Sequence, residues 1–321
     1  MELMAVVAPQ RPEARSISEV MPVTKAAQQE KPTAKKPVRE LTPGVAVAST
    51  ALLIVGGLFL GLVFNLLIFS PMRHDRDQHV AYADFRNQLA NAIAPTGITT
   101  TSGALLAMGA PVAWIDAPGL GIDEVVLNGT TSTVLMSGPG HQRDTVMPGQ
   151  VGHSVVMGRA WAFGGPFKAL AAVAIGTQFS VSTGQGTFDY EVTAVRANGE
   201  DPVALQPGEG RLTLVSASGA PYLPSGLVQL DARLISDPMS ATSPVLPSLM
   251  LASGEAPLVG DSSAAVGLLL WSVLLLGAAL TFVWLSVRWG RWQTWIVAVP
   301  VVVALGVAVT NHIVMLLPNL L

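Results

Sequence analysis

GHSVVMGRAWAFGGPF, residues Gly152–Phe167, is the stretch from which the fold of this chain is first predicted. Its apolar run Val155–Met157 predicts a buried strand, because β-branched residues next to glycine fit a covered, pleated surface. The strand is expected to end at Gly158, and Gly164–Pro166 predicts a turn. Strand ends often present functional side chains, and the side chain presented here is that of Arg159.

On both sides of this stretch, residues 111–236 show short strand patterns separated by glycine-rich turns. Apolar and polar residues alternate clearly in Gln178–Ser182 and in Phe188–Val192. Lys168–Val173 is expected to add one helical turn. The spacing predicts a mainly β domain, a barrel or a sandwich. The predicted strands are Val112–Ile115, Glu124–Leu127, Ser154–Met157, Gln178–Ser182, Thr187–Val195, Arg211–Val215 and Leu227–Leu234.

The composition narrows the class of protein. Of the 321 residues, 50% are hydrophobic and 12% are charged, which is too apolar for an ordinary soluble domain. The net charge of −3 gives no indication of a nucleic-acid-binding surface. The chain has no cysteine, so disulfides, thiolate metal sites and a cysteine nucleophile are all excluded. No cofactor is expected.

Three apolar runs are long enough to cross a bilayer, for which about 20 residues are needed. We expect transmembrane helices at residues 44–70, 264–287 and 292–317. The first run follows a long polar leader, so we interpret it as a retained anchor and not as a cleaved signal peptide. The membrane bilayer is therefore the first expected partner.

Basic residues predict the orientation of the chain in the membrane. The positive-inside rule places residues 1–43, interpreted as a disordered tail, and the turn 288–291 in the cytoplasm. Residues 71–263 and the tail 318–321 are then outside. The basic residues concerned are Lys25, Lys31, Lys35, Lys36, Arg39, Arg288 and Arg291. The tryptophans that fit an interfacial belt are Trp289, Trp292 and Trp295.

The segments between spans and domain have patterns of their own. Asp77–Ala94 predicts a juxtamembrane helix ended by Pro95, and residues up to 110 predict a linker. Residues 237–263 predict a Pro/Ser-rich linker that lies against the barrel or a partner. Gly57 and Gly61 have the spacing of close helix packing, although glycine is also common in membrane helices. Asn311 and His312 are placed at the outer interface.

Residues 111–236 resemble a sortase domain, in particular the class E type of actinobacteria. The resemblance is collinear and covers about two fifths of the chain. It implies a sortase-like β-barrel ectodomain, held by three transmembrane helices in the plasma membrane of a Gram-positive, actinobacterial-type bacterium. The segments that carry it are WIDAPGLGID (114–123), GPGH (138–141), PGQVG (148–152), GGPF (164–167), TGQGTF (183–188) and RLTLV (211–215).

The same resemblance implies that catalysis has been lost. Sortases join a cleaved sorting signal to a cell-wall amine through a thioacyl intermediate, which requires a cysteine, a histidine and an arginine. These functions fall on Ala217, Arg159 and Gly226, respectively. A methyl group cannot attack a carbonyl, and an arginine is not a general base at neutral pH. We therefore expect an inactive, sortase-like structural or accessory subunit of a cell-envelope complex, with envelope or membrane proteins as partners.

Two other functions remain open. A divergent acyltransferase or hydrolase could use Ser216 or Ser218, for which His141 and His153 are the candidate bases in the domain. An accessory subunit of a membrane transporter is the third hypothesis, although its spans contain few ionisable residues. No metal site is predicted, because the acids of the domain lack the spacing of a calcium loop. Those acids are Asp116, Asp123, Glu124, Glu200 and Asp201.

Arg159 has two interpretations. In the first interpretation, Arg159 pairs with an acid such as Asp144 or Glu124, or with loop carbonyls, and fills the space left by the missing catalytic residues. Alternatively, it binds an anionic group or a partner protein in the old cleft. Trp161 and Phe163 on the following loop either belong to the same partner surface or cap the barrel.

Overall fold

The computed structural model describes residues 43–321, except residues 101, 198–199, 201–202, 244 and 290. The predicted disordered tail therefore lies outside the described residues apart from its last position. The chain divides into two compact units, residues 1–48 and residues 49–321. The barrel and the helices that follow it belong to the second unit.

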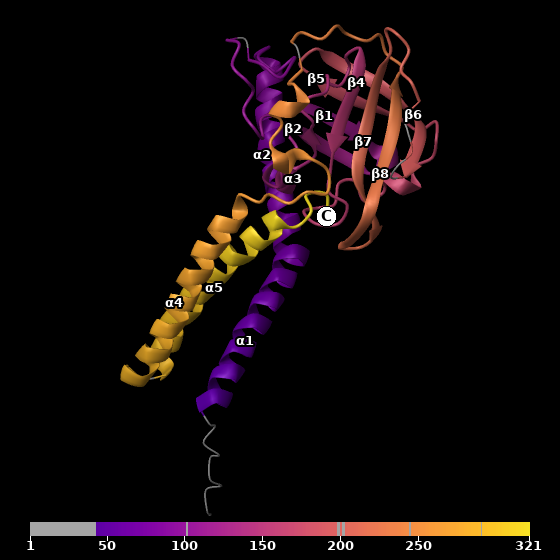
Figure 1. The fold of residues 1–321 in the computed structure, drawn as a ribbon. Coiled ribbons are helices and arrows are strands. Elements are labelled where there is room, and N and C mark those ends of the chain that lie inside the picture. Colours follow the sequence, from indigo (N-terminus) through magenta and orange to yellow (C-terminus); the bar gives the residue numbers. More distant parts are fainter. Residues whose placement is uncertain (1–42, 101, 198–199, 201–202, 244, 290) are drawn as a thin grey trace, which may run out of the picture. The chain divides into compact units, whose positions relative to one another are not determined.

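The domain is a closed barrel of eight strands in the order β1-β2-β3-β4-β7-β8-β6-β5 (Figure 1). Neighbouring strands are antiparallel except for the pairs β2–β3 and β4–β7, which are parallel. The prediction of a mainly β barrel is confirmed. The strands are β1 Pro111–Ala117, β2 Ile122–Asn128, β3 Gly140–His141, β4 Gly152–Met157, β5 Gln178–Thr183, β6 Gly186–Ala197, β7 Gly210–Ala220 and β8 Leu223–Leu234.

All seven predicted strands are present, and each is longer than predicted. Two short elements were not predicted, strand β3 and helix α3 (Ser132–Ser137), which begins after the side-chain cap of Thr131. The predicted helical turn in Lys168–Val173 is the 3-10 turn Leu170–Ala172. Alternating side chains of the strands fill the barrel, where the rings of Phe179 and Tyr190 stack 5.6 Å apart.

The first span continues into the juxtamembrane helix without a break. Helix α1 (Pro43–Phe64) passes through the π-helical turn Asn65–Phe69 into α2 (Ser70–Ala90). The prediction of a separate helix over Asp77–Ala94 is therefore wrong at both ends. Pro71 does not break the helix, because it is the second residue of α2, in its first turn, and the wider π turn ends just before α2.

Helix α2 lies along the barrel wall. Phe85 is 1% exposed and packs in a cluster with Val125, Leu127 and Val134. The side-chain amide of Gln78 pairs with strand β2 as another strand would, because its Oε1 accepts from Val125 N at 2.7 Å and its Nε2 donates to Val125 O at 3.2 Å. The helix is thus part of the domain and not a free spacer.

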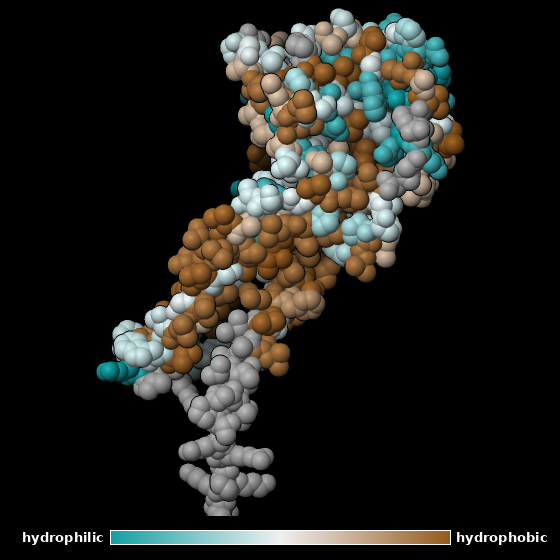
Figure 2. All heavy atoms as spheres, viewed as in Figure 1, coloured by the Kyte–Doolittle hydropathy of each residue, from teal (hydrophilic) through white to brown (hydrophobic). Residues whose placement is uncertain are grey.

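Helices α4 (Ala264–Arg288) and α5 (Arg291–Leu316) follow the barrel. Three helical segments are long and apolar enough to cross a membrane: Val55–Ala90, Ala264–Leu285 and Trp292–Leu316. Figure 2 shows hydrophobic residues over most of the visible face of α4 and α5. The expectation of three apolar helices of membrane-spanning length is confirmed.

The polar and small residues of the spans lie where α1 and α5 approach each other. Asn65 donates a hydrogen bond to Asn311 Oδ1 at 3.2 Å. A Cβ on Gly61 would lie 3.9 Å from Thr310, and a Cβ on Gly57 would meet nothing within 4 Å. Both glycines line an apolar cavity of about 760 Å³ between the helices. Gly61 thus lies within contact distance of α5 of the same chain, and close helix packing at Gly57 remains a prediction.

The linker 237–263 lies against the barrel, as one of the two alternatives predicted. Met239 N donates to Gly149 O at 2.8 Å, and Val151 N donates to Met239 O at 2.9 Å. The side chain of Leu246 is buried in the barrel core. These contacts explain why the linker is more apolar than a free linker needs to be.

Candidate functional site

The parallel pair β4–β7 brings Arg159 and Ala217 to the same end of the barrel. The last rung joins Met157 to Val215, and Gly158 N then donates to Val215 O at 2.9 Å. Two residues beyond this rung, Arg159 follows the end of β4 and Ala217 lies within β7. The structure thus places together two positions that lie 58 residues apart in the sequence.

Strand β8 adds the third position. Ala217 pairs with Leu227, and Ser218 pairs with Gly226, so Gly226 lies one rung beyond Ala217. Arg159, Ala217 and Gly226 therefore gather at one side of the barrel, just beyond the last rung between β4 and β7. This end of the barrel has no thiol and no imidazole at the three positions where the resemblance requires chemistry.

The guanidinium of Arg159 is fully buried and bonded to helix α3. Its Nε donates to Leu135 O at 3.1 Å, and its Nη2 donates to the carbonyl and hydroxyl oxygens of Ser132 at 3.1 and 2.9 Å. It also lies 5.0 Å from the ring centroid of Phe163. Burial lowers the pKa of Arg159 to about 9. Acids and backbone carbonyls were the two predicted kinds of partner for Arg159, and the structure shows the carbonyls.

The acids predicted as partners of Arg159 are used elsewhere. Asp144 accepts from Gln142 and Ser248, both at 2.7 Å. Glu124 lies 2.9 Å from Nε2 of His74 on α2. Pairing of Arg159 with either acid is therefore wrong, because each carboxylate has found a nearer partner.

The loop after Arg159 turns inward. Phe163 is 1% exposed, adopts a positive φ of 53° and packs with Met136 and Val314. Trp161 is half-buried and packs against the cluster that contains Ala217. Arg159 and Phe163 thus have no exposed surface for a partner, so this geometry favours the capping alternative. A partner contact of Trp161 remains a prediction.

The serines beside Ala217 lack the surroundings of a nucleophile. Ser216 is buried and donates to Gly158 O at 2.8 Å. His141 Nε2 bonds to Val146 O at 2.9 Å, and His153 Nε2 lies 2.8 Å from Thr213 Oγ1. Within the described residues, neither histidine is hydrogen-bonded to Ser216 or Ser218. Nothing in this arrangement activates a serine hydroxyl.

A buried polar network, not predicted from the sequence, connects four strands. Thr213 accepts from His153 and donates to Asp231 Oδ1 at 2.7 Å, while Arg196 holds the same carboxylate with bonds of 2.6 and 3.0 Å. Burial opposes ionisation of Asp231, yet the bonds from Arg196 and Thr213 hold its pKa below the usual value. Burial, followed by nearby Arg211, lowers the pKa of His153. The network joins β4, β7, β8 and β6.

The buried imidazole of His141 predicts an acid-sensitive fold. Burial lowers the pKa of His141 from 6.5 to about 4, so below pH 6.5 only the unfolded chain gains this proton. The contribution of neutral His141 to the free energy of unfolding is therefore complete above pH 6.5, and it decreases as the pH drops towards 4. The expected loss attributable to His141 is about 2–3 kcal/mol. Thermal unfolding between pH 7.5 and 4.5 measures it: His141→Gln should flatten the pH dependence, and exposed His79→Gln should not. Equal slopes in all three proteins would contradict this assignment.

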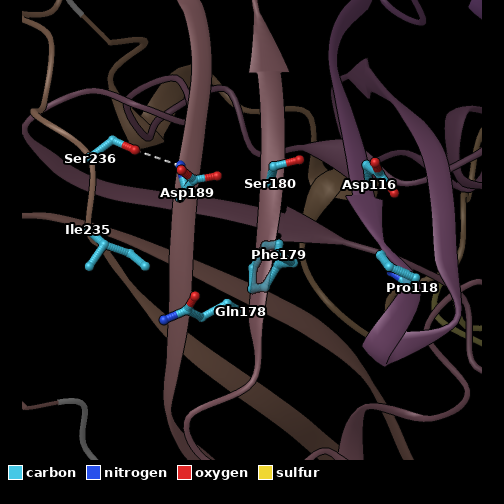
Figure 3. Close-up of a pocket in the computed structure, with 8 residues that line it drawn as sticks. All are labelled: Asp116, Pro118, Gln178, Phe179, Ser180, Asp189, Ile235 and Ser236. Carbon is cyan, nitrogen blue, oxygen red and sulfur yellow. Dashed lines mark hydrogen bonds between the residues drawn. The ribbon is translucent and has the colours of Figure 1, made fainter.

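A polar depression lies across the neighbouring strands β1, β5 and β6 (Figure 3). Its volume is about 450 Å³. Asp116, Ser180 and Asp189 form one row across it, since Asp116 pairs with Ser180 and Ser180 pairs with Asp189. Ser236 accepts a hydrogen bond from Asp189 N at 2.8 Å. The depression is remote in strand order from the ends of β4 and β7.

The acids considered as calcium ligands do not form one cluster. Asp123 accepts from the indole of Trp114 at 2.7 Å, and Glu124 contacts His74. Asp201 lies outside the described residues. Among the residues that the structure describes, no group of three His, Asp or Glu side chains is placed to hold a metal ion. The expectation of no metal site stays a prediction.

Comparison with known proteins identifies similar domains. The family model of the sortase domain matches residues 115–225. The Clostridium perfringens sortase D5 transpeptidase is 18% identical, with 50% of this chain and 99% of that chain covered and a TM-score of 0.42. Sortase C-1 from Actinomyces oris is 26% identical, with 39% and 75% covered and a TM-score of 0.36. No curated protein matches the chain significantly.

The matched residues include most of the barrel, from β1 to the start of β8. The closed barrel contains the parallel β4–β7 pair, and the family model matches the same part of the chain. Residues 115–225 therefore match a sortase domain.

Proposed function

We propose that this protein is a catalytically inactive sortase, a pseudo-sortase, that serves as a structural or accessory binding subunit of a cell-envelope complex. The observation that carries the proposal is the meeting of Arg159, Ala217 and Gly226 at one side of the barrel. No group there can form a thioester or exchange a proton at neutral pH. The strands and turns that would position such groups are nevertheless retained.

The proposed location follows from the spans and the basic residues. The three apolar helices hold the chain in the plasma membrane of an actinobacterial-type cell, with the barrel outside and the amino-terminal residues in the cytoplasm. An external barrel without cysteine is held by its core and its buried ion pairs. Its partners are proteins of the envelope or of the membrane.

An acyl-enzyme assay tests the inactivity. The full chain in detergent, incubated with a labelled sorting-signal peptide, is expected to form no covalent adduct, and Ser216→Ala and Ser218→Ala should behave identically. An adduct that one of these two substitutions abolishes would overturn the proposal in favour of a serine-dependent acyltransferase. A second experiment tests the accessory role. Crosslinking in native membranes, followed by mass spectrometry, should recover a partner protein. Recovery of the monomer alone would contradict the accessory role.

A further inference from the structure

Two cavities adjoin each other where α1 passes into α2. The first is the apolar cavity of about 760 Å³ between α1, α4 and α5, named here the interhelical cavity. The second, named here the arginine cavity, has a volume of about 380 Å³ and lies beside the start of α2. Asn65, Phe69 and Val307 line both cavities, so the two share a wall. Each has the volume of a ligand pocket.

The two cavities differ in their chemistry. Apolar and small residues of three helices line the interhelical cavity, among them Leu58, Leu275 and Gly306. The guanidinium-bearing residues Arg73 and Arg76 line the arginine cavity. Arginine binds phosphate and carboxylate groups well, because its planar group offers paired donors. An apolar space beside two cations therefore fits an amphipathic molecule with an anionic group at one end.

The two arginines have donors left for such a group. Arg73 Nε lies 3.7 Å from Asp77 Oδ2 in a partly exposed pair, and the same oxygen accepts from Ser137 at 2.8 Å. Arg76 is exposed and forms no ion pair with an acid in the described part of the chain. Neither Asp75 nor Asp77 lines the arginine cavity. The charge inside this cavity is therefore positive.

The position of the arginines along the helix fits the headgroup region of a bilayer. The expected span ends at residue 70. Arg73 and Arg76 lie about 4.5 and 9 Å beyond this residue, at about 1.5 Å per residue. A bilayer has a headgroup region of about 5–8 Å on each side of its hydrocarbon core. Basic side chains at this depth attract anionic lipids.

We propose that the two cavities together form a binding site for an anionic phospholipid of the leaflet next to the barrel. The phosphate group contacts Arg73 and Arg76, and one acyl chain occupies the interhelical cavity. A helix of a partner protein fits less well, because about two turns of a helix about 10 Å across would already fill this cavity. The inference goes beyond the proposed function, since it concerns the spans and is independent of catalysis in the barrel.

Native mass spectrometry of the full chain in detergent tests the headgroup part of the site. Phosphatidylglycerol is expected to bind about tenfold or more tightly than phosphatidylcholine with the same acyl chains. Arg73→Gln combined with Arg76→Gln should remove this preference, because each arginine contributes about fivefold. Arg86→Gln is the control, since Arg86 is exposed and lies about 15 Å further along α2 than Arg76. It should leave the preference unchanged.

Filling the interhelical cavity tests the acyl-chain part. A Cβ on Gly306 would meet nothing within 4 Å, so Gly306→Phe places a ring in the cavity without a clash at Cβ. It should weaken the binding of both lipids by about fivefold or more. Gly277→Phe on α4 is the matched control, because its Cβ would also meet nothing and Gly277 does not line the cavity. Thermal unfolding of the same samples checks the folding of each variant.

Four results would overturn the proposal. Equal affinities for the two lipids in the unaltered chain would exclude an anionic headgroup site. Unchanged lipid binding by folded Gly306→Phe would exclude the acyl chain from the cavity. Displacement of phosphatidylglycerol by millimolar inorganic phosphate would show that the arginines bind a free anion. A dimer that Gly306→Phe dissociates would show that a helix of a second copy occupies the cavity. If Gly306→Phe does not fold, the arginine variants decide the outcome.

Discussion

Replacing Arg143 by alanine is expected to lower the free energy of unfolding by about 3–5 kcal/mol. Arg143 and Glu255 form a two-pronged ion pair in which the Glu255 side chain is 0% exposed. Removing the arginine leaves a buried carboxylate without its charge partner, and its remaining bond from Ala252 N at 3.0 Å does not compensate. The hydrogen bond to Glu255 raises the pKa of Arg143, in agreement with a strong pair.

The matched control is an exposed ion pair of the same domain. Arg233 lies 3.2 Å from Glu191, and its side chain is 55% exposed. Arg233→Ala is therefore expected to cost no more than about 1 kcal/mol. Thermal or denaturant unfolding of the full chain in detergent compares the two variants. Equal losses would show that Glu255 does not hold the linker on the barrel.

Replacing Phe85 by alanine is expected to cost a similar amount, about 3–5 kcal/mol. The ring is almost completely buried between α2 and the barrel, against Val125, Leu127 and Val134. Its removal leaves a cavity that a rigid strand and a continuous helix cannot close. The same unfolding measurement applies.

Val80→Ala on the same helix is the control. Val80 is 62% exposed, so its truncation should change the free energy of unfolding by no more than about 0.5 kcal/mol. If Phe85→Ala were as mild as Val80→Ala, α2 would be a spacer beside the barrel and not a part of its wall.

The sequence predicted the barrel because its signals are local. Alternation in β5 and β6 and the glycines between the strands depend only on neighbouring residues. Strand β3 could not be predicted in this way, because its two residues, Gly140 and His141, show no period and pair through distant partners. The course of α2 was also missed, since Pro71 indicates a break when the preceding π turn is unknown.

At the candidate site, the resemblance located Arg159, Ala217 and Gly226, and their proximity depends on the β4–β7 and β7–β8 registers. The sequence left acids and loop carbonyls as alternative partners of Arg159 and could not identify Ser132 and Leu135, because carbonyl acceptors have no residue signature. The sequence predicts residues 318–321 only as a short external tail. Its contacts with Ala160 and Thr130 join residues more than 150 positions apart, and no local pattern encodes them.

Because α1 continues into α2 without a break, the number of residues between two contacts sets the direction in which each side chain points around the helix axis. Each residue turns an α-helix by about 100°, so one inserted residue between Asn65 and Phe85 would rotate Phe85 away from β2 or Asn65 away from Asn311. Many side chains in this interval are exposed and individually replaceable. The number of residues between Asn65 and Phe85 is nevertheless fixed by the two contacts. The exposed positions of this stretch should therefore accept substitutions during divergence, while the stretch rejects insertions and deletions, unlike an ordinary connecting segment at a surface.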